Sequence, residues 1–103
     1  MYDMKNVRQL KKLRELAPAA MKAFDDLNTA VMADGAVPVK YKELIAVAVA
    51  LTTQCPYCIE IHTKKAREAG ATDEELAETA LVSAALRAGG AVTHATHMFP
   101  HSS

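Results

Sequence analysis

The residues best suited to chemistry lie in one short segment, QCPYCIEIH at positions 54–62. It holds the chain's two cysteines, Cys55 and Cys58, in the spacing C-x-x-C. Pro56 favours the first position of a helix, which places Cys55 at the helix start and Cys58 in the first turn. Unpaired backbone N–H groups and the helix dipole favour negative charge there, and the thiolate is the reactive form of cysteine. The segment therefore indicates redox chemistry, with metal binding or two inert buried thiols as the other interpretations.

His62 follows Cys58 by four residues, so the two side chains share one face of the predicted helix. An imidazole at that distance can take the thiol proton or pair with the thiolate. Haem attachment is excluded, because it requires a histidine directly after the second cysteine. Zinc prefers four ligands, and the two cysteines with His62 supply only three. We therefore expect His62 to act together with the thiols.

Other polar and aromatic residues carry weaker signals. His94, His97 and His101 are spaced by three and four residues, which suits a metal-binding helix face, but a proline interrupts the helix before the third. We expect them to lie at a subunit interface, near a neighbouring site, or in an exposed tail. Tyr57 either lines the mouth of the pocket or packs between subunits. Glu60 lies two residues past the second cysteine and is predicted to face away from it.

The elements that must position these residues are predicted to be helices. Apolar residues recur at helical spacing through most of the chain. The apolar run LIAVAVAL, residues 44–51, also suits a buried strand, but its alternate alanines favour a buried helix. Thr72 and Glu75 form a predicted capping box at another helix start. The expected helices cover residues 6–16, 18–35, 39–53, 56–70, 73–87 and 91–98, which makes an all-α fold in a single domain over residues 1–103.

Composition limits the class of protein. The chain has 103 residues, half of them apolar, and its 12 Lys+Arg balance its 12 Asp+Glu. This balance argues against a nucleic-acid partner, and the longest apolar run of eight residues is far below the roughly 20 needed to cross a membrane. The N-terminus has no signal-peptide core, so we expect a soluble cytoplasmic protein with reduced thiols. A chain this small cannot bury so many apolar residues within one subunit. We therefore expect a homo-oligomer, in which other copies of the chain cover the apolar surface that remains exposed.

Glu43 completes a pattern that resembles a known family. Glu43, Cys55, Cys58 and His62 match the E-(11 residues)-C-x-x-C-x-x-x-H pattern of the AhpD-like alkyl hydroperoxidases, part of the wider carboxymuconolactone decarboxylase family. The resemblance covers about residues 38–88. It implies a compact AhpD-like domain of about five to six helices, with a single motif per subunit and assembly into trimers or hexamers.

The resemblance also implies an activity, the thiol-dependent reduction of small-molecule hydroperoxides. By the match, Cys58 attacks the peroxide and becomes a sulfenic acid, and Cys55 condenses with it to form a disulfide. His62 and Glu43 would form the proton relay. No cofactor or metal is required, and a dithiol donor, either a lipoyl-bearing or a thioredoxin-like protein, supplies the electrons. The decarboxylase branch lacks the cysteine pair, which argues against lactone decarboxylation.

Two alternatives stay open from the sequence. A thiol–disulfide oxidoreductase or redox sensor would form the same disulfide reversibly but consume peroxide slowly. A zinc-binding assembly module would hold metal near stoichiometry and lose its oligomer on chelation. Within the peroxidase interpretation, the apolar neighbours Val47, Ile59 and Ile61 favour organic hydroperoxides over hydrogen peroxide.

Overall fold

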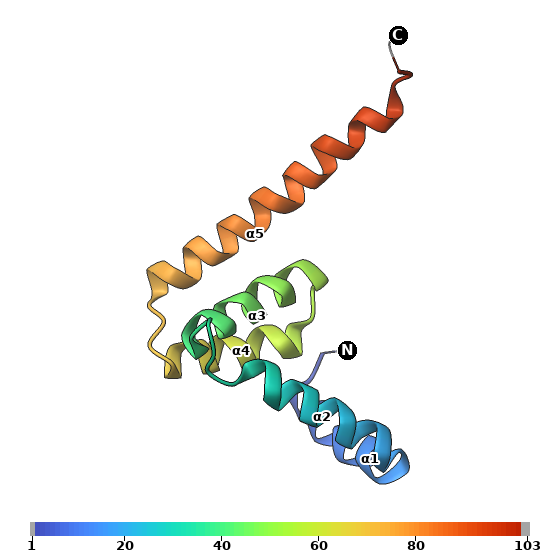
Figure 1. The fold of residues 1–103 in the computed structure, drawn as a ribbon, viewed down its shortest axis with the longest axis vertical. Helices are drawn as coiled ribbons and strands as arrows, with labels where there is room; N and C mark the ends of the chain where they lie inside the picture. Colours follow the sequence, from blue (N-terminus) through green and yellow to red (C-terminus); the bar gives the residue numbers. More distant parts are fainter. Residues whose placement is uncertain (1, 102–103) are drawn as a thin grey trace.

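The computed structural model describes residues 2–101. Every regular element in this range is a helix. The all-α prediction is therefore confirmed. Figure 1 shows α3 and α4 side by side, the long α5 running past α3, and α1 with α2 forming an arm on the other side. In chain order the elements are η1 (Met4–Gln9, a 3-10 helix), α1 (Leu10–Leu16), α2 (Pro18–Met32), α3 (Val39–Thr53), α4 (Pro56–Glu68), α5 (Asp73–His94) and η2 (Ala95–Met98, a 3-10 helix).

The core lies where α3 packs against α4 and the start of α5. Leu44 and Val47 of α3 meet Ala66 of α4 and Ala71 of the following loop, and Ala66 is completely buried. Small side chains at these contacts let the helix backbones approach closely. The helix expected over residues 39–53 is confirmed, and it ends at Gln54, whose φ of 57° is left-handed.

The start of α5 matches its prediction, but its end does not. The Thr72 hydroxyl accepts from the Glu75 backbone N–H at 3.1 Å, and the Glu75 carboxylate accepts from the Thr72 N–H at 2.9 Å, as expected for a capping box. The expected end of this helix at Arg87 is wrong, because α5 continues through Gly89 and Gly90. Two glycines cost only about 1 kcal/mol each in a helix, so they weaken it without ending it. The separate last helix predicted over 91–98 is the end of α5 followed by η2.

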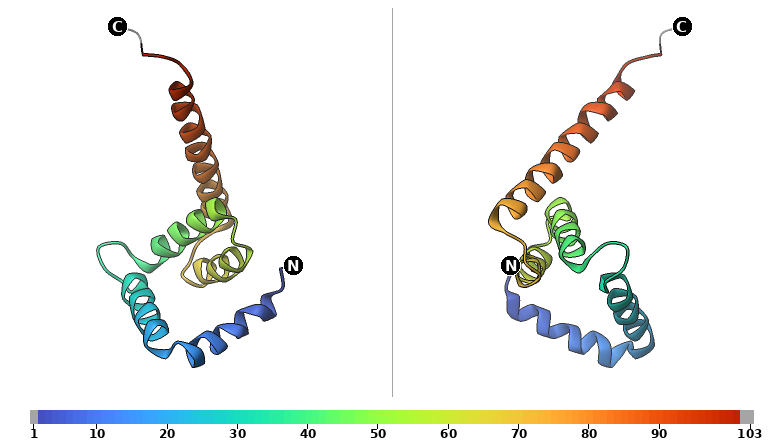
Figure 2. Two further views of the ribbon diagram at one scale, coloured as in Figure 1. Left: turned by 90° about the vertical axis from the view of Figure 1, so that its right-hand side faces the viewer. Right: turned by 60° about the vertical axis from the view of Figure 1, so that its left-hand side comes forward.

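The N-terminal arm differs in detail from the prediction. The helix expected over residues 6–16 is η1 followed by α1, and α2 ends at Met32 rather than near Gly35. A two-pronged ion pair of Arg14 with Asp25, at 2.8 and 3.0 Å, ties α1 to α2. Figure 2 shows α2 leading away from the α3–α4 pair and the chain turning back through α1, so that the N-terminus lies near α4. The arm and the projecting α5 give a radius of gyration of 17.7 Å, against about 13 Å for a compact chain of this length.

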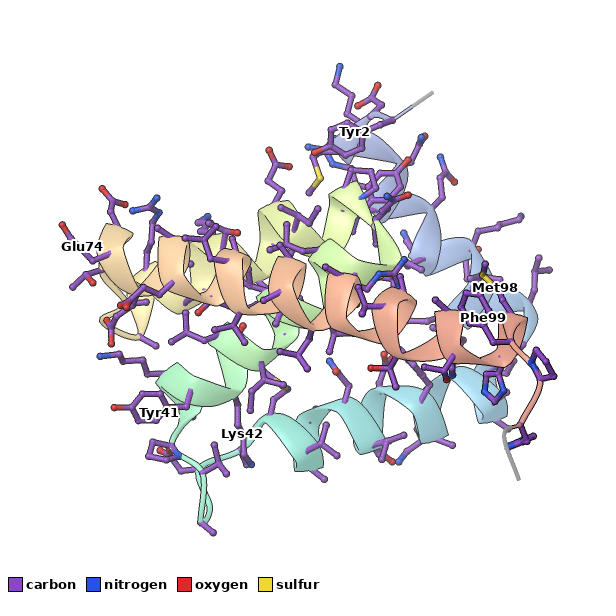
Figure 3. All side chains as sticks on the ribbon, turned by 90° about the horizontal axis from the view of Figure 1, so that it is seen from above. Tyr2, Tyr41, Lys42, Glu74, Met98 and Phe99 are labelled. Carbon is purple, nitrogen blue, oxygen red and sulfur yellow. The ribbon has the colours of Figure 1, made fainter. Side chains whose placement is uncertain are left out.

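The subunit leaves much of its apolar surface uncovered. Its accessible surface is 7999 Å², whereas a compact monomer of the same mass exposes about 5,700 Å². Phe24 and Leu27 of α2 and Leu86 of α5 are each more than half exposed. Figure 3 shows side chains spreading on both sides of α5 between Glu74 at its start and Met98 and Phe99 beyond its end. Within residues 2–101 we find no helix that is both long enough and apolar enough to span a membrane.

Candidate functional site

All four residues of the predicted site lie on the α3–α4 hairpin. Because α4 runs back along α3, Glu43 near the start of α3 faces His62 in the middle of α4. Cys55 and Cys58 lie at the start of α4, about two turns and one turn before His62. Hydrogen bonds join Glu43 to His62 and Cys55 to Cys58, and in the described part of the chain none joins one pair to the other.

The two cysteines form a reduced, closely spaced pair. Their Sγ atoms are 2.9 Å apart, longer than the roughly 2.05 Å of a disulfide, and both side chains are partly exposed. Pro56 occupies the first helical position and Cys55 the N-cap, as the sequence predicts. The Cys55 sulfur caps the helix by accepting from the Cys58 backbone N–H at 3.4 Å. The helix start therefore directs its free donors at the Cys55 sulfur.

This arrangement shifts the pKa values of the two thiols in opposite directions. The hydrogen bond from the Cys58 thiol lowers the pKa of Cys55, and the backbone N–H groups of Cys58 and Tyr57 lower it further. The same thiol contact raises the pKa of Cys58, as do its burial and the nearby charge on Cys55. Of the two thiols, Cys55 therefore loses its proton at lower pH, and Cys58 keeps its proton to higher pH. For Cys58 to attack, another group must remove that proton.

The first test of this charge distribution is alkylation of the reduced protein by iodoacetamide. A lowered pKa means that Cys55 is already thiolate at pH values where an ordinary thiol is protonated, so we expect Cys55 to be modified first at neutral pH. Cys58 should react only above the ordinary thiol range, because its pKa is raised. Peptide mapping by mass spectrometry between about pH 5 and pH 10 spans both transitions. Earlier labelling of Cys58 throughout that range would contradict the assignment.

Glu43 and His62 form a pair that is largely shielded from solvent. The Glu43 Oε2 atom lies 2.8 Å from His62 Nδ1, and Glu43 is only 4% exposed. A buried carboxylate is costly without a partner, and this contact supplies one. When Nδ1–H donates to the carboxylate, Nε2 is the nitrogen left to accept a proton. The geometry suits His62 to act as a base whose charged form is stabilised by Glu43.

The N-terminal segment makes contacts that the sequence did not predict. The Tyr2 hydroxyl donates to the Glu60 carboxylate at 3.0 Å, and the Asn6 side chain donates to the Tyr57 hydroxyl at 3.1 Å. The Tyr2 and Tyr57 rings also meet edge to face, with centroids 5.0 Å apart. Figure 3 shows Tyr2 on the η1 side of the molecule. Tyr57 therefore anchors this segment within its own subunit, and Glu60 is exposed as predicted.

An open hollow of about 560 Å³ lies beneath Tyr2 on the outer face of α4. Pro56 and Ile59 line its apolar part, and Lys64 and Arg67 lie at its charged part. No spacing rule relates positions more than 50 residues apart, so sequence periodicity carries no signal for it.

The C-terminal histidines lie apart from this hairpin. The rings of His94 and His97 are tilted against each other with centroids 5.6 Å apart, near the end of α5. His97 and His101 line a separate hollow there. Across residues 2–101, no group of three or more His, Cys, Asp or Glu side chains is arranged to hold a metal ion.

Comparison with known sequences points to one family. A sequence model of the carboxymuconolactone decarboxylase family matches residues 18–99. The chain is 55% identical over 73 residues to an uncharacterized protein encoded in the cox locus of Paracoccus denitrificans; the match covers 71% of this chain and 66% of that protein. It is 38% identical over 89 residues to an uncharacterized protein of Cupriavidus necator, over 86% of this chain and 79% of the relative.

Solved structures show the same fold. A protein from Methanobacterium thermoautotrophicum superposes with a TM-score of 0.80 at 36% identity, over 85% of this chain and 99% of that one. A carboxymuconolactone decarboxylase family protein from Legionella pneumophila superposes with a TM-score of 0.75 at 40% identity, over 80% of this chain and 73% of that one. The helical architecture is therefore shared with both.

Proposed function

The chain belongs to the carboxymuconolactone decarboxylase family, and from that membership we propose that it is an enzyme that reduces organic hydroperoxides with the Cys55–Cys58 pair. One observation carries the proposal: the two reduced sulfurs lie 2.9 Å apart at the start of α4. A thiol oxidised by peroxide becomes a sulfenic acid, which a neighbouring thiol captures as a disulfide. The second sulfur already lies at contact distance, so capture needs little movement.

The first step uses Cys58 as the attacking thiol and His62 as its base. His62 Nε2 accepts the Cys58 proton, and Glu43 stabilises the resulting imidazolium. The Cys58 thiolate attacks the terminal oxygen of the hydroperoxide, so that an S–O bond forms while the O–O bond breaks. The departing alkoxide takes the proton from His62 and leaves as the alcohol. Cys58 is then a sulfenic acid, and His62 is neutral again.

In the second step Cys55 resolves the sulfenic acid. Its lowered pKa supplies a thiolate, which attacks the Cys58 sulfur; the S–S bond forms, the S–O bond breaks, and hydroxide leaves and is protonated to water. A dithiol donor of the lipoyl or thioredoxin-like class then reduces the disulfide by thiol–disulfide exchange. Over one cycle, the donor loses two electrons and two protons and the peroxide becomes alcohol and water. The two sulfurs return to their starting state.

The test is stopped-flow consumption of cumene hydroperoxide by pre-reduced, metal-free protein. We expect one equivalent of peroxide to disappear per subunit, with two thiols lost to an internal disulfide, far faster than with free cysteine at the same pH. Hydrogen peroxide, run in parallel, should react more slowly, because Ile59 and Ile61, which follow Cys58 in the chain, are apolar. Consumption no faster than with free cysteine would rule out the peroxidase.

A second candidate function, thiol–disulfide exchange without peroxidase turnover, is favoured by the lowered pKa of the partly exposed Cys55. Such a thiolate attacks disulfides directly. This candidate is preferred if the reduced protein cleaves a small aromatic disulfide rapidly but consumes cumene hydroperoxide only at the rate of free cysteine.

A further inference from the structure

An apolar groove between α3 and α5 remains uncovered in the subunit. Three open hollows lie along the contact of α3 with α5, and neighbouring hollows share lining residues. On the α3 side, Tyr41, Ile45 and Val49 each have about half of their surface exposed. On the α5 side the groove is lined by Glu78, Thr79, Val82, Ser83, Leu86 and Arg87. We call these six residues the α5 stripe.

The α5 stripe has a charge of opposite sign at each end. Glu78 begins it and Arg87 ends it, and neither forms an ion pair with another residue in the range 2–101. They are nine residues apart, or about 13 Å along the helix axis. Between them the exposed side chains are mainly apolar, with Val82 and Leu86 both more than half exposed. A stripe that is acidic at one end and basic at the other complements its own reversed copy.

We propose that the exposed part of the α5 stripe binds the same part of a second copy of this chain, antiparallel. The two-fold axis passes between positions 82 and 83, where Val82 is exposed and Ser83 is buried within its own subunit. In this arrangement Glu78 meets the partner's Arg87, and Arg87 meets the partner's Glu78. The axis lies one residue from the midpoint of the 22-residue α5, so nearly the whole length of both helices overlaps. Such an interface is isologous, because both copies use the same patch.

The subunit exposes enough surface area to form an interface between two copies of α5. Its 7999 Å² exceeds that of a compact monomer by about 2,300 Å², and a stable interface needs about 800 Å² from each partner. Beyond Arg87, added Cβ atoms at Gly89 and Gly90 would meet nothing within 4 Å in the subunit. A facing helix can therefore approach closely there. The proposal concerns assembly and does not depend on the chemistry of the cysteines.

Charge reversal tests the pairing. Glu78→Arg or Arg87→Glu alone places like charges together at both ends of the interface, so we expect each to raise the dissociation constant at least tenfold, measured by light scattering coupled to size exclusion. The double variant Glu78→Arg/Arg87→Glu restores both pairs and should restore the wild-type mass. Lys11→Glu on α1 is the control and should change nothing. Wild-type masses should be even multiples of 11.1 kDa; a monomer or trimer, or a double variant that fails to recover, overturns the proposal.

Cross-linking tests the register independently of any charge effect. In a Cys55→Ser/Cys58→Ser background, Val82→Cys places two thiols beside the axis, and mild oxidation should link the two copies. Val92→Cys, on the same helix, places them about 28 Å apart along the axis and should link at least tenfold more slowly. A parallel pairing would bring the two copies of Val92 together. Equal cross-linking at both positions, or none at Val82→Cys, therefore overturns the antiparallel arrangement.

Discussion

Replacing Cys58 by serine is expected to lower the rate of peroxide consumption by about 10³-fold or more, since the attacking sulfur is lost. Replacing Cys55 by serine is expected to leave the first turnover intact, because Cys58 and the Glu43–His62 pair remain. That variant should then stop as a sulfenic acid, since the resolving thiol 2.9 Å away is missing. Stopped-flow kinetics, with mass spectrometry after trapping by a sulfenic-acid reagent, measures both outcomes.

The opposite result in the two cysteine variants would exchange the roles assigned to Cys55 and Cys58. The lowered pKa of Cys55 makes it the thiol that ionises first. If Cys55→Ser is inactive while Cys58→Ser forms a sulfenic acid, Cys55 is the attacking thiol. Both variants should keep the wild-type circular dichroism spectrum, because neither sulfur is part of the core. If both variants are folded, any difference between them in peroxide consumption and sulfenic-acid formation reports the roles of the two cysteines.

Replacing Glu43 by glutamine is expected to lower the second-order rate constant with peroxide by about 10²-fold, the lower end of what a positioned acid–base group contributes. The amide preserves the shape of the side chain and can still accept from His62 Nδ1, but it removes the negative charge that stabilises the imidazolium. The His62→Gln variant should lose a similar factor. The double variant should be little worse than either, because the two residues act as one unit.

Glu60→Gln supplies the matched control for Glu43→Gln. Glu60 lies on α4 near the pair but is exposed and hydrogen-bonded to Tyr2, so its replacement should leave the rate unchanged. Equal rates in the two variants would exclude Glu43 from the relay. Denaturant unfolding of both variants separates a loss of catalysis from a loss of folding.

The parts of the fold that local rules govern were predictable. The bounds of α3, the position of Pro56 at the first residue of α4 and the capping box of α5 all follow from neighbouring residues. The Glu43–His62 contact was predictable only through the family pattern, because nothing local relates residues on two different helices. Once α3 and α4 pack antiparallel, their spacing brings them together.

Other features depend on tertiary contacts that the sequence does not reveal. Gly89 and Gly90 resemble a helix end, yet α5 runs on because each glycine imposes only a modest cost. The ties of Tyr2 and Asn6 to α4 connect positions more than 50 residues apart. The order of the two thiol pKa values also escaped prediction, since it depends on which sulfur caps the helix.

The placement of the whole site on one hairpin has a consequence for how the chain folds. Glu43 and His62 are 19 residues apart and the two cysteines three, with only Gln54 and Cys55 between the helices. Closing a loop this short carries a small entropic cost, and contacts of low sequence separation form early. We therefore expect the reactive groups to come together as soon as α3 and α4 pair. Their assembly should not require the docking of the N-terminal arm or of α5, whose contacts with α4 and α3 join more distant parts of the chain.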